Sequence, residues 1–269
     1  MEIFEGTPFD PLFEWTRATS WSERSQIARA TLPTLVRLGA GAHVQGACRR
    51  PPSELLVLYE RETCPRSRLV REAMAMLDLD AWIKPVPSGS TIHAPELLAL
   101  TGQVNVPVLV DPATGAVIEG AQAILMHLFE HYGHAAIPLR LRLMPTSRLA
   151  SRLRGGRGQK ARVRHVPQRT LELTGYEASP STRLVREILD ELELPYISKQ
   201  LAASSPRRRA FFESTGSMEL PHLFDPNEHI EIVSLGPIMT YLEQTYGSEH
   251  ASVCSLERAR TRALYGRKR

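Results

Sequence analysis

Two stretches of this chain are copies of one another. Residues 55–78 align with residues 170–193 at a constant offset of about 115, and both contain an identical RLVRE run. The register continues, with a slip of one residue, from 106–133 to 220–247. A unit of roughly 80 residues can close its own hydrophobic core, whereas solenoid repeats of about 20–50 residues cannot. The duplication therefore predicts two tandem domains rather than a repeat array.

The repeat also predicts how the rest of the chain is divided. The expected segments are an N-terminal segment (1–52), a first module (53–133), a basic linker (134–168), a second module (169–247) and a basic tail (248–269). The N-terminal segment has helical apolar spacing over 27–44, and we expect it to pack on a module rather than to contact a membrane surface.

Positive charge is concentrated in one part of the chain. Residues 134–169 contain nine Arg and one Lys but no acidic residue, so the rest of the chain is net acidic although the formal net charge is +4. A run of this kind is typical of a site for nucleic acid or anionic lipid, or of a solvated linker. No aromatic residues are interleaved in it for base stacking. We therefore favour a linker partly packed between the modules, and nucleic acid is not an expected partner.

Composition and cysteine usage limit the class of protein. With 42% hydrophobic and 23% charged residues, the chain is typical of a soluble globular protein. No apolar run reaches the length of a membrane span, and the N-terminus does not resemble a signal peptide, which predicts a cytoplasmic protein. Cys48, Cys64 and Cys254 are too few for a disulfide framework, and no Cys/His cluster has metal-ligand spacing. We expect reduced thiols and no metal site.

Periodicity and helix breakers predict the order βαβαββα in each module, with a mixed four-stranded sheet in each. Pro65 and Pro180 each follow an apolar run and stand at the first position of a helix, which favours proline. In the first module we expect a strand at 55–59, a helix from Pro65, a strand at 82–86, a helix at 94–100, a hairpin after Pro107 and a helix at 121–132. In the second we expect the corresponding elements at 170–174, from Pro180, at 196–199, at 207–214, after Pro221 and at 235–246.

Three short motifs carry a resemblance to a known family. They are Cys64-Pro65-Arg66-Ser67 at a strand-to-helix turn, Val106-Pro107 before a strand, and Glu119-Gly120 before the last helix. Together they resemble the thioredoxin-like, N-terminal domain of glutathione S-transferases and glutaredoxins. The whole pattern looks like tandem proteins with two such modules. Pro107 and its counterpart Pro221 are then expected to follow cis peptide bonds.

The resemblance implies a glutathione site in the first module. The N–H groups and dipole at a helix N-terminus favour an anion, so Cys64 is expected to react as a thiolate. In the family, the backbone of the residue before the cis-proline, here Val106, pairs with glutathione. An acidic residue and a serine before the last helix hold the γ-glutamyl end, and this module has Glu119 and Gly120 at those positions. The second module has Val233 and Ser234 there and is the poorer candidate.

Departures from the family limit the chemistry. Dithiol members carry a second cysteine three residues after the first, and this chain has Ser67 there. The second module has Ser179 and Thr182 at the two positions. Only a monothiol mechanism through Cys64 is therefore expected, with Ser67 as a candidate hydrogen-bond donor to the thiolate. Conventional transferases also need a large helical domain for the electrophile, and the segment between the modules is too short to form one.

Two classes of function are consistent with these observations. The first is a glutathione-dependent, glutaredoxin-like thiol-disulfide oxidoreductase, whose partners would be glutathione or another small thiol and protein disulfides. The second is a non-catalytic thioredoxin-fold scaffold with degenerate sites. In either class the two modules could pair within the chain or in a homodimer. Retention of Cys64 favours the first class, and loss of the other motif cysteines favours the second.

Overall fold

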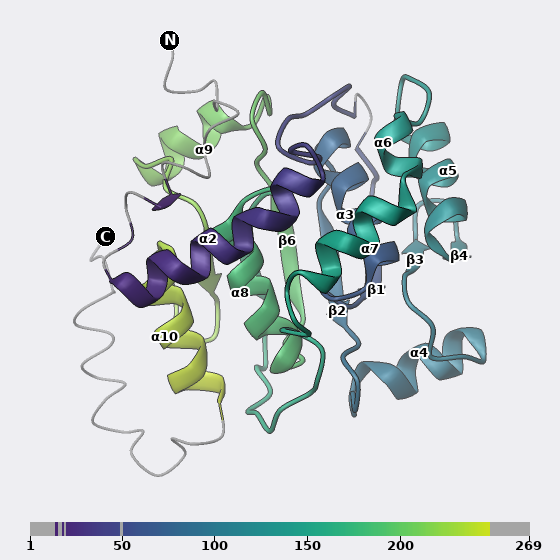
Figure 1. Ribbon diagram of the computed structural model, residues 1–269. Coiled ribbons are helices and arrows are strands. Elements are labelled where there is room, and N and C mark those ends of the chain that lie inside the picture. The colour runs from purple at the N-terminus through teal and green to yellow at the C-terminus, as the bar shows by residue number, and fades with distance from the viewer. Residues whose placement is uncertain (1–13, 16–17, 19, 49–50, 248–269) are drawn as a thin grey trace.

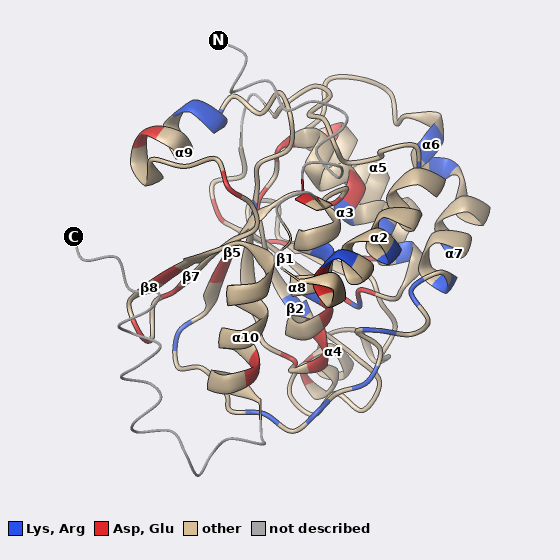
Figure 2. Cartoon of the chain, turned by 60° about the vertical axis from the view of Figure 1, so that its left-hand side comes forward, with Lys and Arg blue, Asp and Glu red and all other residues tan. Residues whose placement is uncertain are grey.

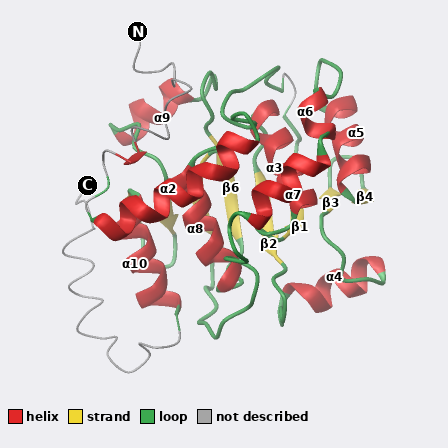
Figure 3. Cartoon of the chain, in the orientation of Figure 1, coloured by secondary structure: helices red, strands yellow, loops and turns green. Residues whose placement is uncertain are grey.

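A computed structural model of the chain describes residues 14–15, 18, 20–48 and 51–247 (Figure 1). The predicted basic tail and Cys254 lie outside these residues. Helices and strands alternate as in an α/β protein, and Figure 3 shows the helices packed over the strands.

Each module has the predicted order of elements. In the first, these are β1 (Leu56–Glu60), α3 (Pro65–Leu77), β2 (Ala81–Pro85), α4 (His93–Thr101), β3 (Val108–Asp111), β4 (Ala116–Glu119) and α5 (Ala121–His131). In the second, they are β5 (Leu171–Gly175), α8 (Pro180–Glu191), β6 (Tyr196–Gln200), α9 (Arg208–Thr215), β7 (His222–Asp225), β8 (Ile230–Val233) and α10 (Leu235–Tyr246). The predicted boundaries are within one or two residues of these.

The strands of the two modules form one sheet rather than two. Its order is β4-β3-β1-β2-β6-β5-β7-β8, so each module supplies four neighbouring strands. The modules join where β2 pairs antiparallel with β6, with Ala81 opposite Ser198 and Ile83 opposite Tyr196. An edge strand presents unpaired N–H and C=O groups. The two edge strands satisfy each other's groups, and this continuity was not foreseen in the prediction of a separate sheet for each module.

Residues of β1 alternate between the two faces of the sheet. Leu56 and Leu58 are fully buried in the main hydrophobic core, which also contains residues of α3 and α5. Tyr59 belongs instead to a small cluster with Leu97 of α4 and Val108 of β3. This period of two is that of a strand covered on both faces.

Prolines stand at the positions that the sequence predicts. Pro65 and Pro180 are the first residues of α3 and α8, where no backbone N–H is needed. Val106–Pro107 and Leu220–Pro221 are both cis peptide bonds. The two modules therefore share the backbone features on which the resemblance depends.

The segments before each module are also structured. Helix α2 (Trp21–Val36) packs against α8 and α7, which confirms that the N-terminal segment packs on a module. The predicted linker contains two helices, α6 (Leu139–Arg142) and α7 (Met144–Arg152), and α7 packs against α3 (Figure 1). Figure 2 shows Lys and Arg gathered on α6, α7 and the segment that follows them. The basic segment is therefore part of the packed structure.

These two segments are themselves equivalent, and they are exchanged between the modules. We call residues 20–44 arm 1 and residues 139–161 arm 2. Val44 N–H donates to Ala203 O at 2.8 Å, and Ala203 N–H donates to Ala42 O at 2.8 Å, so arm 1 binds the second module. Arm 2 makes the matching pair with Ser88 of the first module, through Gln159 O at 2.7 Å and Ala161 N–H at 2.9 Å. Each arm thus precedes one module and packs on the other.

A buried ionic network joins the two modules beneath α3 and α8. Glu62 and its sequence counterpart Glu177 are each 2% exposed. Glu177 lies 2.8 Å from Arg186 and 2.9 Å from Arg71, while Glu62 lies 2.9 Å from Arg186 and 3.1 Å from Arg71. Arg68 and Arg183 complete the ring around them. The duplicated RLVRE runs therefore supply one shared core of charge.

Within the described part of the chain, no helix combines the length and the apolar character needed to cross a bilayer.

Candidate functional site

The predicted nucleophile lies at the turn between β1 and α3. Cys64 is the N-cap residue of α3 and is partly exposed. No side chain caps this helix start. The thiol Sγ lies 3.7 Å from the carbonyl oxygen of Val106, the residue before the cis-proline. The structure therefore brings Cys64 and Val106 together, as the resemblance implies.

A pocket of about 660 Å³ opens beside this thiol. Its wall comes partly from the first module, through the β1–α3 turn and the loop before Pro107, and partly from arm 2. The arm residues that line it are Arg148, Ser151, Arg152, Gly156 and Gln159. The Ser147 hydroxyl of α7 donates to Pro65 O at 2.7 Å, which holds arm 2 against the start of α3. Arm 2 therefore forms one side of the thiol site.

The predicted partner Ser67 is fully buried and does not line this pocket. Its hydroxyl accepts a hydrogen bond from the Arg61 backbone N–H at 3.5 Å. The Arg61 side chain donates from Nε to Val86 O at 2.9 Å. In this geometry Ser67 stabilises the turn that carries Cys64 rather than contacting the thiol.

Glu119 and Gly120 line a second pocket, of about 570 Å³, which also includes Arg66 and the first residues of α5. Gly120 has φ of +82° and is the N-cap of α5, which no side chain caps. A Cβ added at Gly120 would meet nothing within 4 Å, so this helix start is open. Uncapped N–H groups at a helix N-terminus form a binding site for a carboxylate. Of the predicted site residues, Cys64 and Val106 thus line one pocket and Glu119 and Gly120 line another.

The turn that carries Cys64 is anchored by the second module. Glu62 lies two residues before Cys64, and its backbone N–H donates to Asp190 Oδ2 at 2.7 Å. Burial would raise the pKa of the Glu62 carboxyl, but Arg186 and Arg71 lower it below its ordinary value. Glu62 is therefore held as a carboxylate, and the charge network fixes the position of the turn.

Two other buried acids of the network have a raised pKa. Burial raises the pKa of Glu60 to about 7 although Arg71 opposes it, and burial together with Glu60 raises the pKa of Asp190 well above its usual range. Their counterparts in the duplication are Gly175 and Ala75. The two modules therefore contribute different acids to an otherwise symmetric network.

The equivalent turn of the second module is sealed. Ser179 is fully buried, and its hydroxyl accepts from Thr182 N–H at 3.0 Å as the N-cap of α8. Thr34 of arm 1 donates to Ala178 O at 2.8 Å, beside the serine. Leu220, the counterpart of Val106, packs against a buried cluster of the second module, and so do Ala42 and Val44 of arm 1; the cluster consists of Tyr176, Ala178 and Ala202. Arm 1 thus fills the space that the pocket occupies in the first module.

In the second module, the serine before the last helix is already hydrogen-bonded. Ser234 before α10 donates its hydroxyl to the carboxylate of Glu219. A carboxylate at this position repels the γ-glutamyl carboxylate that the family binds there. Ser234 is thus already paired within the second module.

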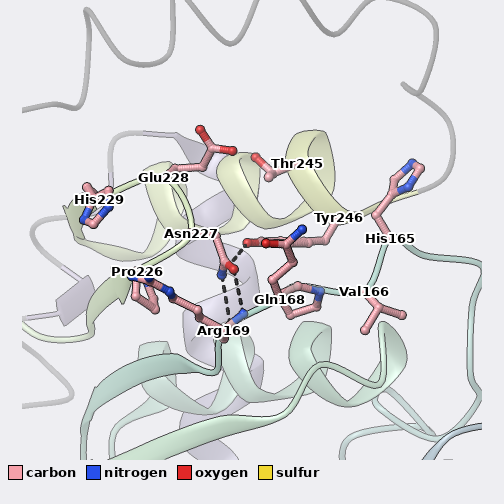
Figure 4. Close-up of a pocket in the computed structure, with 11 residues that line it drawn as sticks. His165, Val166, Gln168, Arg169, Pro226, Asn227, Glu228, His229, Thr245 and Tyr246 are labelled. Atoms are coloured by element: carbon pink, nitrogen blue, oxygen red, sulfur yellow. Dashed lines mark hydrogen bonds between the residues drawn. The ribbon is translucent and has the colours of Figure 1, made fainter.

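A third pocket, of about 460 Å³, lies between residues 165–169, the β7–β8 turn and the end of α10 (Figure 4). Figure 4 shows Asn227 directed at Arg169. The Asn227 amide accepts from Arg169 N–H at 2.7 Å and donates to Arg169 O at 2.9 Å. These contacts tie the start of β5 to the hairpin. In the ranges that the structure describes, no group of three His, Cys, Asp or Glu side chains could hold a metal ion.

Sequence reasoning missed the contribution of arm 2 to the site. Arg148, Ser151 and Arg152 belong to the segment that was interpreted as a linker. The signal that could have found them is weak: 31–44 and 148–161 share a leucine, an arginine and two glycines at a constant offset of 117. That pattern marks the arms as part of the duplicated unit.

The fold and site define a thioredoxin-like protein in which one of two modules keeps a cysteine at the start of its first helix. The model of the glutathione S-transferase N-terminal domain matches the sequence twice, at residues 58–136 and 173–250. The two matches cover more than half of the chain, which therefore belongs to this family. Comparison with curated proteins and with solved structures gives no significant match.

Proposed function

We propose that the protein binds glutathione in its first module and acts as a monothiol thiol-disulfide oxidoreductase through Cys64. The observation that carries this proposal is the position of the thiol, at an uncapped helix start and 3.7 Å from the backbone carbonyl of Val106. Helix N-termini stabilise thiolates, which are the nucleophiles of disulfide exchange.

Glutathione would bind across the start of α3. Its cysteinyl backbone would pair with Val106, beside Pro107, and its γ-glutamyl carboxylate would meet the open N-terminus of α5 at Gly120. The γ-glutamyl ammonium would be held by the exposed carboxylate of Glu119. Ser67 would act indirectly, by holding the turn that presents Cys64.

The reaction proceeds in two exchanges. The Cys64 thiolate attacks the glutathione sulfur of a mixed disulfide, forming a Cys64–glutathione disulfide and releasing the substrate thiolate, which takes a proton from water. The thiolate of a second glutathione then attacks that disulfide, giving oxidised glutathione and restoring the Cys64 thiolate. The net reaction converts one mixed disulfide and one free glutathione into the substrate thiol and oxidised glutathione, so free glutathione is the reductant. A reducing compartment such as the cytoplasm supplies this reductant.

The test is glutathione-dependent reduction of a small glutathione mixed disulfide, followed through glutathione reductase and NADPH. We expect activity in the wild type and in Cys48→Ser, which keeps Cys64, and none in Cys64→Ser. Mass spectrometry after exposure to oxidised glutathione should show the adduct at Cys64. An inactive wild type with no adduct at Cys64 would refute the proposal.

The alternative is a non-catalytic scaffold, which the sealed and serine-bearing second module favours. In that case glutathione would neither form an adduct with Cys64 nor protect it from alkylation, and the Cys64→Ser variant would bind the same proteins as the wild type.

A further inference from the structure

We propose that arm 2 forms a subsite for a carboxylate group beside Cys64, so that the enzyme prefers disulfides whose non-glutathione half is a small anionic thiol. This inference rests on the proposed exchange at Cys64. It assigns to Arg148, Ser151 and Arg152 the recognition of the group that leaves.

The first observation is the charge of the pocket. Arg61, Arg148 and Arg152 line it with Cys64, and no acidic residue does. Arg148 and Arg152 are four residues apart on α7, so they lie on the same face of the helix. Both are exposed, and among the described residues no carboxylate lies within ion-pair distance of either. The pocket therefore has an excess of unneutralised positive charge.

The second observation is a buried hydroxyl without a partner. Ser151 lies between the two arginines in sequence, lines the same pocket and is 9% exposed. Its Oγ is buried and has no hydrogen-bond partner among the residues that the structure describes. Leaving a buried polar atom without a hydrogen bond is unfavourable. A ligand oxygen in the pocket would satisfy it.

The third observation is that this wall is peculiar to the first module. In the duplication, Arg148, Ser151 and Arg152 correspond to Thr31, Thr34 and Leu35 of arm 1. Thr34 closes the second module by donating to Ala178 O at 2.8 Å. Ser151 makes no such bond. The same scaffold position thus seals one module and leaves a cationic pocket in the other.

The exchange reaction at Cys64 produces negative charge on the leaving thiol, which a cationic pocket would stabilise. When the Cys64 thiolate attacks the glutathione sulfur, the S–S bond breaks and the electron pair leaves on the sulfur of the substrate thiol. A substrate with a carboxylate then carries two negative charges until its thiolate is protonated by water. Guanidinium groups bind a carboxylate with charge-assisted hydrogen bonds and stabilise charge that develops nearby.

The test compares three mixed disulfides of glutathione that differ in the charge of the other half: 3-mercaptopropionate, 2-mercaptoethanol and cysteamine. The wild type should have the highest kcat/KM with the anionic compound and the lowest with the cationic one. Removing two charge-assisted contacts should lower the anionic-to-cationic ratio about tenfold or more in the Arg148→Gln/Arg152→Gln double variant, since about 1.4 kcal/mol corresponds to a factor of ten.

Two single variants sharpen the comparison. Arg157→Gln removes the same charge from the same arm, but Arg157 does not line the pocket, and its side chain reaches Gln26 at 3.4 Å. It should keep the wild-type ratio. Ser151→Ala should lower the anionic preference severalfold without loss of stability, because the hydroxyl has no partner to lose. Equal ratios in the wild type and the double variant would overturn the proposal.

A second measurement separates this proposal from the proposed activity. Cys64 is alkylated with iodoacetate, which is anionic, or iodoacetamide, which is neutral, and each rate is divided by the rate with free glutathione as a reference thiol. The normalised ratio should favour iodoacetate in the wild type and fall in the double variant. This result would support the anionic subsite even in a protein that reduces no disulfide. Active exchange with no charge preference in either assay would overturn the subsite alone.

Discussion

The two modules present the same turn in opposite states. In the first, Cys64 is partly exposed at the edge of a pocket of about 660 Å³. In the second, Ser179 is fully buried and serves as the N-cap of α8. The backbone is alike in both, down to the cis peptide bond before Pro107 and Pro221. The fold therefore does not decide which module has a site, and the segment that covers the turn does.

The covering segments are the two exchanged arms. Arm 1 places Thr34, Ala42 and Val44 against the second module, and small or apolar groups fill the space there. Arm 2 places charged and polar groups against the first module, and these leave a solvated pocket. A long charged side chain keeps its head in water and does not fill an apolar space. Divergence of the arms thus accounts for the divergence of the sites.

The largest expected effect tests the scaffold that both modules share. Burial would raise the pKa of the Glu177 carboxyl, but four surrounding guanidinium groups lower the pKa well below its ordinary value. They belong to Arg186, Arg71, Arg68 and Arg183. Glu177→Gln keeps the shape and leaves buried positive charge uncompensated. We expect the free energy of unfolding to fall by about 3–5 kcal/mol. Urea unfolding followed by circular dichroism measures this change.

The counterpart and a surface control make this result specific. Glu62→Gln should lower the free energy of unfolding by a similar amount, because Glu62 lies among the same four arginines. Glu213→Gln removes a carboxylate that is paired with Arg209 on an exposed helix face, and it should change stability by less than about 1 kcal/mol. Equal, small effects at all three positions would show that the network does not hold the modules together.

The second prediction transfers the thiol to the sealed module. Ser179→Cys places a cysteine at the helix start equivalent to that of Cys64, but under arm 1. Alkylation should require local opening, so in a Cys64→Ser background its rate should be roughly a hundredfold below that of Cys64 in the wild type, which is about 2.7 kcal/mol of protection. Alkylation by iodoacetamide with mass spectrometry measures both rates. Comparable rates would mean that arm 1 does not seal the turn.

Much of this fold could be predicted from the sequence. Periodicity and the prolines Pro65 and Pro180 predict the order of elements because they are local signals, and the duplicated RLVRE runs predict two modules. The joining of β2 to β6 could not be predicted, because pairing between edge strands depends on the relative placement of the modules and leaves no mark in residue spacing. The hydrogen bond that Ser67 accepts from Arg61 could not be predicted either, since the direction of the Ser67 side chain depends on how the turn is closed.

The third prediction concerns pH and uses an asymmetry between the modules. The pKa of Glu60 is raised to about 7 in the folded protein from an ordinary value of 4.5. Between these pH values the native state binds more protons than the unfolded state, so stability should fall as pH rises. We expect a loss on the order of 1–3 kcal/mol from pH 5 to pH 8. Glu60→Gln should weaken this dependence in urea unfolding, because it keeps the neutral form at position 60 and leaves the contribution of Asp190, whose pKa is also raised.

The smallest expected effect lies in the two arms. Gly41 and Gly158 are equivalent, with φ of +79° and +74°. Gly41 packs against Glu177 of the second module, and Gly158 packs against Glu62 of the first. A Cβ at Gly41 would lie 2.9 Å from Glu177 Cβ, whereas a Cβ at Gly158 would meet Glu187 Cα at 3.3 Å and Glu62 Cβ at 3.4 Å. Gly46 also has positive φ but nothing within 4 Å. Substitution at Gly46 therefore measures the energetic cost of the backbone conformation without a steric clash.

Gly46→Ala should lower the free energy of unfolding by about 1 kcal/mol, because residue 46 has a left-handed backbone conformation. Gly158→Ala should lower the free energy of unfolding somewhat more, and Gly41→Ala the most, because an added Cβ meets its nearest atom at 3.3 Å at Gly158 and at 2.9 Å at Gly41. Thermal unfolding of the three variants measures the order. If Gly41→Ala were no worse than Gly46→Ala, the close approach of arm 1 would contribute nothing to sealing the second module, and the difference between the two sites would have to arise from Cys64 and Ser179 themselves.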